Sequence, residues 1–340
     1  MLTAKEIEEI RDYLNKSENP LFLYDDDPDG LCSYVLLKKY IDRGKGIIIK
    51  GAPLLEEKWV KKVEEYSPDL VVILDKPIVS QEFIDKINVP ILWIDHHPII
   101  KRKGIHHYNP RYHDENDNSP TTFLAYQIVK QNLWIAMIGC IADWYVPDFA
   151  DEFSKKYKDL LNKVTTPEDT LFNTGIGRLV RIVSFILKGK NMEVNKNISI
   201  FSRIESPYEI LKEETPKGKF ISRYSNKINK IYHTLLEKSL KEATEDKILL
   251  FIYPDSKISF TSDLANELLY RYPKKLIIIG RETNEEVKLS LRSTNIKLPP
   301  LIEKALKEVK GYGGGHDFAC GANIAKNDFK TFIDNLKNLL

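Results

Sequence analysis

The feature that most constrains this chain is an alternation of short apolar runs with helix-like stretches over its first hundred residues. Four apolar runs have the length of buried strands, at 21–24, 46–50, 70–74 and 90–94. Stretches with helical character separate them, at 31–41, 56–65 and 81–87. Strand and helix repeated in this way predict an open parallel sheet with helices on its faces.

The rest of the chain predicts further helices and then a second α/β region. Helices are expected at 120–129 and 133–143, and most of 151–244 reads as helical. Strands are then expected at 248–253, 275–279, 287–292 and 319–324, with helices at 263–270, 300–309 and 328–339. A chain of 340 residues is long for one core. We therefore predict an α/β protein with a catalytic domain at 1–190, a helical linker at 191–246 and a smaller α/β domain at 247–340.

Composition narrows the class of protein. The net charge is only +2, so any surface that binds nucleic acid must be local. The three cysteines, Cys32, Cys140 and Cys320, are far apart and form no CxxC pair, which argues against a disulfide framework or a zinc–thiolate site. No run of about 18 apolar residues occurs, so no membrane association is expected. Together these features predict a cytoplasmic protein.

Acidic residues follow three of the four predicted strands of the first region. The first strand runs into Asp25 and the acidic loop behind it, the third ends at Asp75, and the fourth ends at Asp95 and His96. Parallel strands place their carboxyl ends at one edge of a sheet, so these side chains should meet. Carboxylates with imidazole and no thiolate suit Mn²⁺ or Mg²⁺. Two such ions can share a carboxylate, activate water and stabilise the oxygens of a phosphodiester.

Other interpretations of the acidic loop are weaker. Taken alone, each acid could be a solvated turn residue, and the histidines could be a surface pair. Asp25, Asp27, Asp29 and Gly30 match the first half of an EF-hand loop, but the twelfth position is Leu36 instead of glutamate. The occurrence of acids at successive strand ends is what favours a metal site.

Six motifs in order give the sequence a family resemblance. They are DDDPDG at 25–30, VVILD at 71–75, DHH at 95–97, GCIAD at 139–143, SLRS at 290–293 and GGGH at 313–316. With these motifs the chain resembles the DHH phosphoesterases, and among them the archaeal RecJ-like nucleases. The last two motifs resemble the hallmarks of the DHH-associated domain. The resemblance leaves 151–247 without a matching motif.

The resemblance implies roles for individual residues in the first domain. Asp75 would bridge two Mn²⁺ ions, with Mg²⁺ as an alternative metal. Asp25 stands where many relatives have a metal-binding histidine, so it is expected as an additional ligand. His97 would orient the site or contact the scissile phosphate. The implied ligands are Asp27, Asp29, Asp75, Asp95, His96 and Asp143.

In the second domain the resemblance implies substrate binding, and the chemistry of the residues agrees. Consecutive glycines leave backbone N–H groups free to approach a phosphate. Arg292 can direct two N–H groups at phosphate oxygens, and His316 can add a further donor. We expect a glycine loop that holds the end of the substrate across from the metals, formed by Arg292, Ser293, Gly313, Gly314, Gly315 and His316.

The leading functional hypothesis is a single-strand-specific exonuclease on DNA or RNA that releases mononucleotides, with 3′→5′ polarity. Three alternative enzymes share the two-domain plan: an oligoribonuclease (nanoRNase), a nucleotide-bisphosphate phosphatase and a cyclic-dinucleotide phosphodiesterase. Their first motif usually begins with histidine, whereas here it begins with Asp25. An alternative of another class is a structural replisome component. The retained acids argue against pure scaffolding, although a catalytic protein could also have a replisome partner and act in replication or DNA repair.

Overall fold

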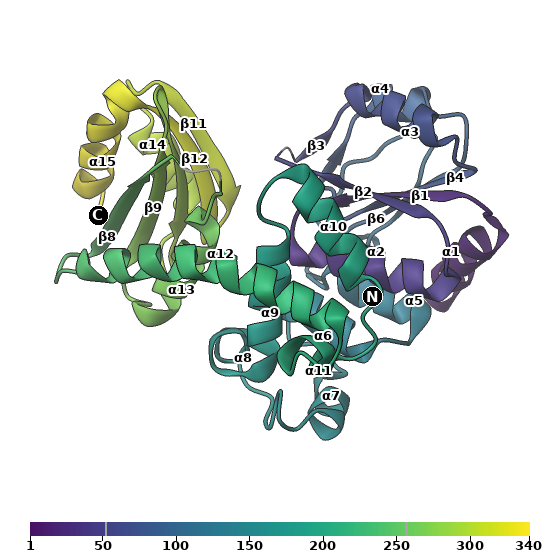
Figure 1. Cartoon of the computed structure of the whole chain (residues 1–340). Coiled ribbons are helices and arrows are strands. Elements are labelled where there is room, and N and C mark those ends of the chain that lie inside the picture. Colours follow the sequence, from purple (N-terminus) through teal and green to yellow (C-terminus); the bar gives the residue numbers. More distant parts are fainter. Residues whose placement is uncertain (52, 256–257) are drawn as a thin grey trace. The chain divides into compact units, whose positions relative to one another are not determined.

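The computed structural model describes residues 1–51, 53–255 and 258–340. The chain forms two compact units, Met1–Ser225 and Asn226–Leu340 (Figure 1). The division falls inside the long helix α12 (Pro216–Lys241). The stretch 191–246, which we expected as a linker, is therefore shared between the units, and its helices α10 (Asn191–Phe201) and α11 (Pro207–Leu211) lie in the first.

A five-stranded parallel sheet organises the described part of the first unit. Its strand order is β2-β1-β4-β6-β7. Four strands lie where the sequence predicts them: β1 (Pro20–Asp25), β2 (Lys45–Ile49), β4 (Leu70–Leu74) and β6 (Ile91–Ile94). The fifth, β7 (His106–Tyr108), escaped prediction because it has only three residues and begins with two histidines. It pairs with β6 and forms one edge of the sheet.

Side chains that alternate along β1 pack on opposite faces of this sheet. Helices cover both of these faces (Figure 1). Phe22 and Tyr24 join the core formed with α2 (Pro28–Ile41), α5 (Thr121–Val129) and α6 (Leu133–Ala142). Leu21 and Leu23 pack against α3 (Val60–Tyr66) and α4 (Gln81–Asp85). Since both faces are covered, the strands read in sequence as continuous apolar runs.

Smaller elements complete the first unit. A capping box of Thr3 and Glu6 begins α1 (Ala4–Lys16). A two-stranded parallel pair, β3 (Leu54–Leu55) and β5 (Ile78–Val79), lies outside the main sheet. The region after the fourth motif is helical, as expected, and contains α7 (Ala150–Lys156), α8 (Pro167–Asn173) and α9 (Gly175–Ile186).

The second unit contains a mixed sheet of order β11-β12-β10-β9-β8. β8 (Ile248–Pro254) and β9 (Leu276–Glu282) are parallel, whereas β10 (Glu286–Arg292), β11 (Gly311–His316) and β12 (Ala319–Ala325) pair antiparallel. Its core lies between the sheet and two helices, α14 (Leu298–Ala305) and α15 (Phe329–Asn338). The helix α13 (Thr261–Arg271) packs on β9 and β10.

One local expectation about this unit is wrong. The glycines 313–315 were expected in a loop, but they belong to the edge strand β11 and pair with β12 residue by residue. Glycine has no side chain to produce the alternation of apolar and polar residues that reveals a strand, so the sequence hides β11.

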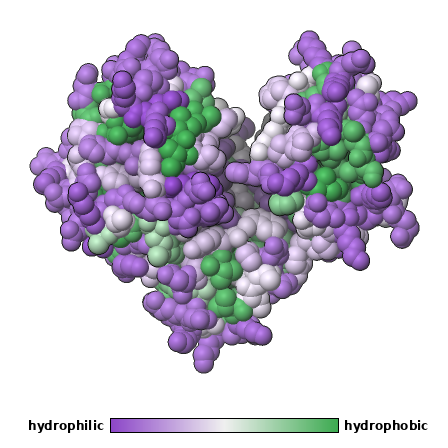
Figure 2. Space-filling model, turned by 180° about the vertical axis from the view of Figure 1, so that it is seen from behind, coloured by the Kyte–Doolittle hydropathy of each residue, from purple (hydrophilic) through white to green (hydrophobic). Residues whose placement is uncertain are grey.

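Within the described residues, no helix combines the length and the apolar character needed to cross a membrane. On the face drawn in Figure 2, hydrophilic residues cover most of the surface and hydrophobic residues show as separate patches.

Candidate metal centre

The ends of β1, β4 and β6 bring acidic residues together in the first unit. Tyr24 on β1 lies opposite Leu74 on β4, so the residues that follow them, Asp25 and Asp75, come from neighbouring strand ends. Asp75 has a left-handed backbone (φ 57°), and its N–H donates to the carbonyl of Ile94 on β6 at 3.1 Å. This turn at the end of β4 buries the Asp75 side chain in the acid cluster.

The start of α2 adds two further acids. Asp27 is the N-cap, and its carboxylate accepts the N–H of Gly30 at 2.9 Å. Asp29 lies in the first turn and is buried. A Cβ at Gly30 would lie 2.7 Å from the carbonyl oxygen of Asp25, so glycine is required for α2 to begin this close to β1.

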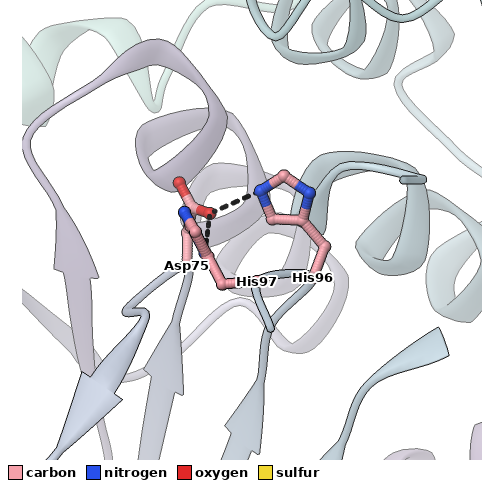
Figure 3. Close-up of side chains that lie close together, drawn as sticks. All are labelled: Asp75, His96 and His97. Carbon is pink, nitrogen blue, oxygen red and sulfur yellow. Dashed lines mark ion pairs between the residues drawn. The ribbon is translucent and has the colours of Figure 1, made fainter. Parts of the chain in front are cut away.

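The DHH triplet places both of its histidines beside Asp75 (Figure 3). His96 Nε2 lies 3.5 Å from Asp75 Oδ1, and His97 Nδ1 lies 4.0 Å from the same oxygen. His96 Nε2 also lies 3.7 Å from Asp143 Oδ2, at the C-terminal end of α6. The triplet thus connects the strand-end acids with the acid of the fourth motif.

Asp95 plays a different part from the other acids. Its Oδ2 accepts the backbone N–H of His97 at 3.0 Å, and its Oδ1 lies 2.8 Å from His97 Nδ1. Asn109 donates to both Asp95 and the carbonyl of His97. Burial lowers the pKa of His97, but the hydrogen bond and charge of Asp95 outweigh this effect and raise it. The geometry favours Asp95 as the group that orients His97.

Burial and mutual repulsion raise the pKa of the clustered carboxyls. Desolvation and then the charge of Asp27 raise the pKa of Asp25 to about 6. Desolvation and the charge of Asp29 do the same for Asp27, to about 6. Burial and the charges of Asp29 and Asp27 raise the pKa of Asp75 and Asp143 well above the usual range. Such a cluster is stabilised by cations.

The donor atoms of the cluster are carboxylate oxygens and imidazole nitrogens, which suit divalent ions such as Mn²⁺ and Mg²⁺. Within the described residues, three sets of ligand atoms lie within 4.8 Å of one another: Asp75 with His96 and His97, Asp29 with His96 and Asp143, and Asp25 with Asp27 and Asp75. Asp75 belongs to two of the sets, as expected for a carboxylate shared between two ions. Asp95 belongs to none of the three.

Two residues that the sequence argument missed support this cluster from α5. The backbone N–H groups of Thr121 and Thr122 donate to the two oxygens of Asp29, at 2.9 and 2.7 Å. The Thr121 hydroxyl donates to Asp75 at 3.1 Å. The start of a helix favours negative charge, so α5 holds Asp29 as an anion-binding helix N-terminus does. The predicted helix start near Pro120 was the available signal.

The third missed residue is Lys76, whose side chain is fully buried. Its Nζ lies 2.5 Å from Asp25 Oδ1. The Trp93 indole N–H donates to the carbonyl of Lys76 at 2.8 Å and so helps to fix the backbone behind Asp75. A buried lysine is rare unless it is paired, and this one places its Nζ beside the acid that we expected as an additional metal ligand. Its position directly after Asp75 was the only sequence signal.

Family models match both ends of the chain. The family model "DHH family, N-terminal domain" matches residues 22–161, and "DHHA1 domain" matches residues 259–340. The two matches together span more than half of the chain. The chain belongs to the DHH family. A search of curated protein sequences found no match.

Solved structures share the DHH fold of this chain. A RecJ from Thermus thermophilus with Mn²⁺ is 14% identical with a TM-score of 0.70, and the match covers 98% of this chain and 54% of that one. An exonuclease RecJ bound to manganese is 15% identical with a TM-score of 0.66, covering 100% and 94%. The DHH domain of a member of a ribosomal protein family is 14% identical with a TM-score of 0.71, covering 98% and 89%. This DHH protein thus spans about half the length of the Thermus RecJ.

The residues expected to bind substrate in the DHHA1 unit lie within antiparallel strands, whereas the acids of the metal centre follow the ends of parallel strands. Arg292 on β10 and His316 on β11 both lie opposite Ala319 on the strand between them. Arg292 is held by the Asn266 side chain, which accepts from Nε at 2.7 Å. Burial lowers the pKa of Arg292 to about 10, which still leaves it charged at neutral pH. The hydroxyl of Ser293 is engaged in a local turn, where it accepts from the N–H of Ile296 at 3.1 Å.

Proposed function

We propose that this protein is a two-metal-ion phosphodiesterase whose metal centre is the acid cluster of the first unit. The observation that carries the proposal is the set of three adjoining ligand groups built around Asp75 and His96. The raised pKa values of the surrounding carboxyls give the cluster a need for cations that a solvated group of turn acids would not have. The proposed ligands are Asp25, Asp27, Asp29, Asp75, His96 and Asp143.

Different residues of this centre would bind the metal ions, orient His97 and donate a proton. Mn²⁺ or Mg²⁺ would lower the pKa of bound water and stabilise the oxygens of the phosphodiester in the transition state. Asp75 would be shared between the ions, and Asp95 would hold His97 in the direction that it takes here. His97, whose pKa is raised, can keep a proton and donate it to a phosphate oxygen.

For the substrate, we propose single-stranded DNA or RNA that is degraded from its 3′ end to mononucleotides. The family and the fold that this chain shares with RecJ structures support a nucleic-acid substrate. The row of Arg292 and His316 across β12 supports a phosphate contact in the second unit. A replisome partner remains a prediction, which capture of partner proteins from cell extract would test.

The runner-up is an enzyme that prefers very short or small substrates: an oligoribonuclease, a nucleotide-bisphosphate phosphatase or a cyclic-dinucleotide phosphodiesterase. The first motif of such enzymes usually begins with histidine, whereas here it begins with Asp25, whose carboxylate pairs with Lys76. This difference favours our proposal over the runner-up.

Degradation of end-labelled DNA and RNA oligonucleotides of several lengths tests both functions. We expect Mn²⁺-dependent release of mononucleotides from the 3′ end of single strands, and no release in EDTA. A rate that rises steeply as the substrate shortens to two nucleotides would establish the runner-up. The absence of hydrolysis of any oligonucleotide with either metal would overturn the proposed nuclease.

A further inference from the structure

A cavity of about 750 Å³ lies in the first unit, and none of its lining residues is a proposed metal ligand. It is formed where the last turn of α2 meets the start of β2 and the end of α10. Lys38 at the cavity follows Asp27 at the acid cluster by 11 positions, so roughly 16 Å of helix separates them. Small molecules bind in pockets of about 300–1,000 Å³, so this cavity can hold a ligand of nucleotide size.

Two buried tyrosines line this cavity and have unused hydroxyls. Tyr24 on β1 and Tyr34 on α2 stack, with ring centroids 4.5 Å apart and an angle of 6° between the rings. They are only 1% and 5% exposed, and within the described residues neither hydroxyl has a hydrogen-bond partner. Burial raises the pKa of both hydroxyls and so keeps them protonated. Buried hydroxyls normally have a partner, so these two need one from the cavity, either water or a ligand.

Gly46 on β2 allows the tyrosine rings to reach the wall of the cavity. A Cβ at this position would lie 2.4 Å from Cζ of Tyr34, the ring atom that carries the hydroxyl, and 2.8 Å from Cε1 of Tyr24. Any side chain here would therefore displace both rings. Since Gly46 itself lines the cavity, the hydroxyl-bearing end of Tyr34 lies at the cavity wall.

Cationic side chains outnumber acidic ones around the cavity. Lys39 is already paired, since its Nζ lies 2.7 Å from Glu205 Oε1. The other charged residues of the lining are three cations and one acid: Lys38, Lys45, Arg203 and Asp42. A lysine in the last turn of a helix offsets the helix dipole, which accounts for Lys38 on α2. It does not account for Lys45 on β2 or for Arg203 after α10, so the fold leaves an excess of positive charge unexplained.

Lys38 and Arg203 lie close enough to repel each other. Burial lowers the pKa of Lys38, the charge of Asp42 raises it, and the charge of Arg203 lowers it. Lys38 Nζ donates to the carbonyl of Gly44 at 2.8 Å, and Nη2 of Arg203 donates to the Ser199 hydroxyl at 2.9 Å. Both side chains have further N–H groups to offer. An anion between them would relieve the repulsion and accept these N–H groups, as phosphate oxygens do.

We propose that this cavity is a second binding site, for a small phosphorylated molecule of nucleotide size. The phosphate binds between Lys38 and Arg203, and polar groups of the attached sugar or base bind the hydroxyls of Tyr24 and Tyr34. Tyr34 and Lys38 are one turn apart on the same face of α2, with Cβ atoms roughly 6 Å apart, a span that one nucleotide bridges. The site does not depend on the proposed function, because it shares no residue with the metal centre.

Isothermal titration calorimetry with AMP, adenosine and inorganic phosphate tests this site. The full chain is titrated in EDTA, so that no metal ion can bind AMP at the acid cluster. We expect one AMP per chain, weaker binding of inorganic phosphate, and no binding of adenosine at about 1 mM. Binding of adenosine as tight as that of AMP, or no binding of AMP at about 1 mM, would overturn the proposal.

Substitutions locate the binding site in the chain. Lys38→Gln and Arg203→Gln each remove a charged phosphate contact and should raise the Kd of AMP about tenfold. Tyr34→Phe removes one hydroxyl and should raise it about threefold. Arg203 is exposed, so Arg203→Gln should unfold at the parent temperature, which separates lost binding from lost folding.

Two further substitutions serve as controls. Lys16→Gln removes an exposed lysine outside the cavity and should bind AMP as the parent does. Arg292→Ala should also keep the parent Kd, because the phosphate contact proposed in the second unit is separate. The site is wrong if Arg203→Gln and Lys38→Gln keep the parent Kd, or if Arg292→Ala abolishes binding. Hydrolysis is not measured in these titrations, so their failure is distinct from a failure of the proposed function.

Discussion

The acid cluster of the first unit and the row of Arg292, Ala319 and His316 in the second bring their residues together by opposite means. In the first unit, buried carboxylates crowd together where parallel strands end, and Lys76 and the start of α5 hold them in place. In the second, Arg292, Ala319 and His316 stand in a row across antiparallel strands, and Arg292 is partly buried.

This difference indicates that the first unit binds cations and that the second contacts the substrate. The buried cluster concentrates charge where a cation is needed, and hydrogen bonds from α5 restrain Asp29 and Asp75. The row in the second unit instead offers contact along several residues of its strands. Substitutions in the first unit should therefore change the chemical step and the stability, whereas those in the second should change substrate affinity.

The largest effect is expected at Asp75. Asp75→Asn removes the carboxylate that two ligand groups share, and we expect kcat/KM on a single-stranded oligonucleotide to fall at least about 100-fold. Asp12→Asn is the matched control, because Asp12 is an exposed acid paired with Lys16. A rate within threefold of the parent protein for Asp75→Asn would remove the metal assignment.

The next effect concerns pH. Asp25 and Asp27 have pKa values of about 6 in the folded protein, above the ordinary 3.8, so between these pH values the folded state binds more protons than the unfolded chain. Their stabilising contribution is full below about pH 4 and is lost as the pH rises through 6. The unfolding temperature of the metal-free protein should fall over this range by more than that of Asp27→Asn, and Mn²⁺ at pH 7 should reverse the fall. Parallel curves for the two proteins would contradict the raised pKa.

A smaller effect is expected from Lys76→Met, which leaves Asp25 without its buried partner. We expect urea unfolding in EDTA to show a loss of about 2 kcal/mol, below the roughly 3–5 kcal/mol of a fully buried pair because Asp25 is partly exposed. Adding Asp25→Asn should recover part of the loss. Lys16→Met breaks an exposed pair, which solvent screens, and should cost far less than Lys76→Met. Equal losses for the two lysines would show that burial of the Lys76 pair is unimportant.

In the second unit, Arg292→Ala should raise KM about tenfold and change kcat less than about threefold, because it removes a charged contact to the substrate and leaves the metal centre intact. Arg292→Lys keeps the charge but not the planar fork, so its KM should lie in between. Steady-state kinetics would measure both. A fall in kcat with an unchanged KM would place Arg292 in the chemical step instead.

The smallest effect is expected at Ser293, which we first assigned to the substrate. Its hydroxyl accepts from the N–H groups of Asn295 and Ile296, so Ser293→Ala should cost about 1 kcal/mol of stability and leave KM within about twofold. A tenfold rise in KM would restore the direct substrate contact.

The sequence was sufficient for four of the five strands of the first unit's sheet and for the convergence of its acids, because parallel strands place their carboxyl ends at one edge. It could not separate Asp95 from the other acids, since only the direction of its oxygens shows that it holds His97. It also could not reveal the ion pair of Lys76, because a lysine after a strand is usually solvated.

In the second unit the motifs were visible in the sequence but their spatial relation was not. Arg292 and His316 are 24 positions apart in the sequence. They lie in one row only because each pairs with Ala319 on β12. The strand β11 has no apolar alternation, so its pairing could not be derived before the structure.

The central claim is that the acid cluster is a centre for two divalent ions. Equilibrium dialysis against Mn²⁺, followed by elemental analysis, tests it most directly. We predict two Mn²⁺ ions per chain for the unsubstituted protein and a lower number for Asp75→Asn. Binding of no Mn²⁺, or an identical number of ions in both proteins, would contradict the account.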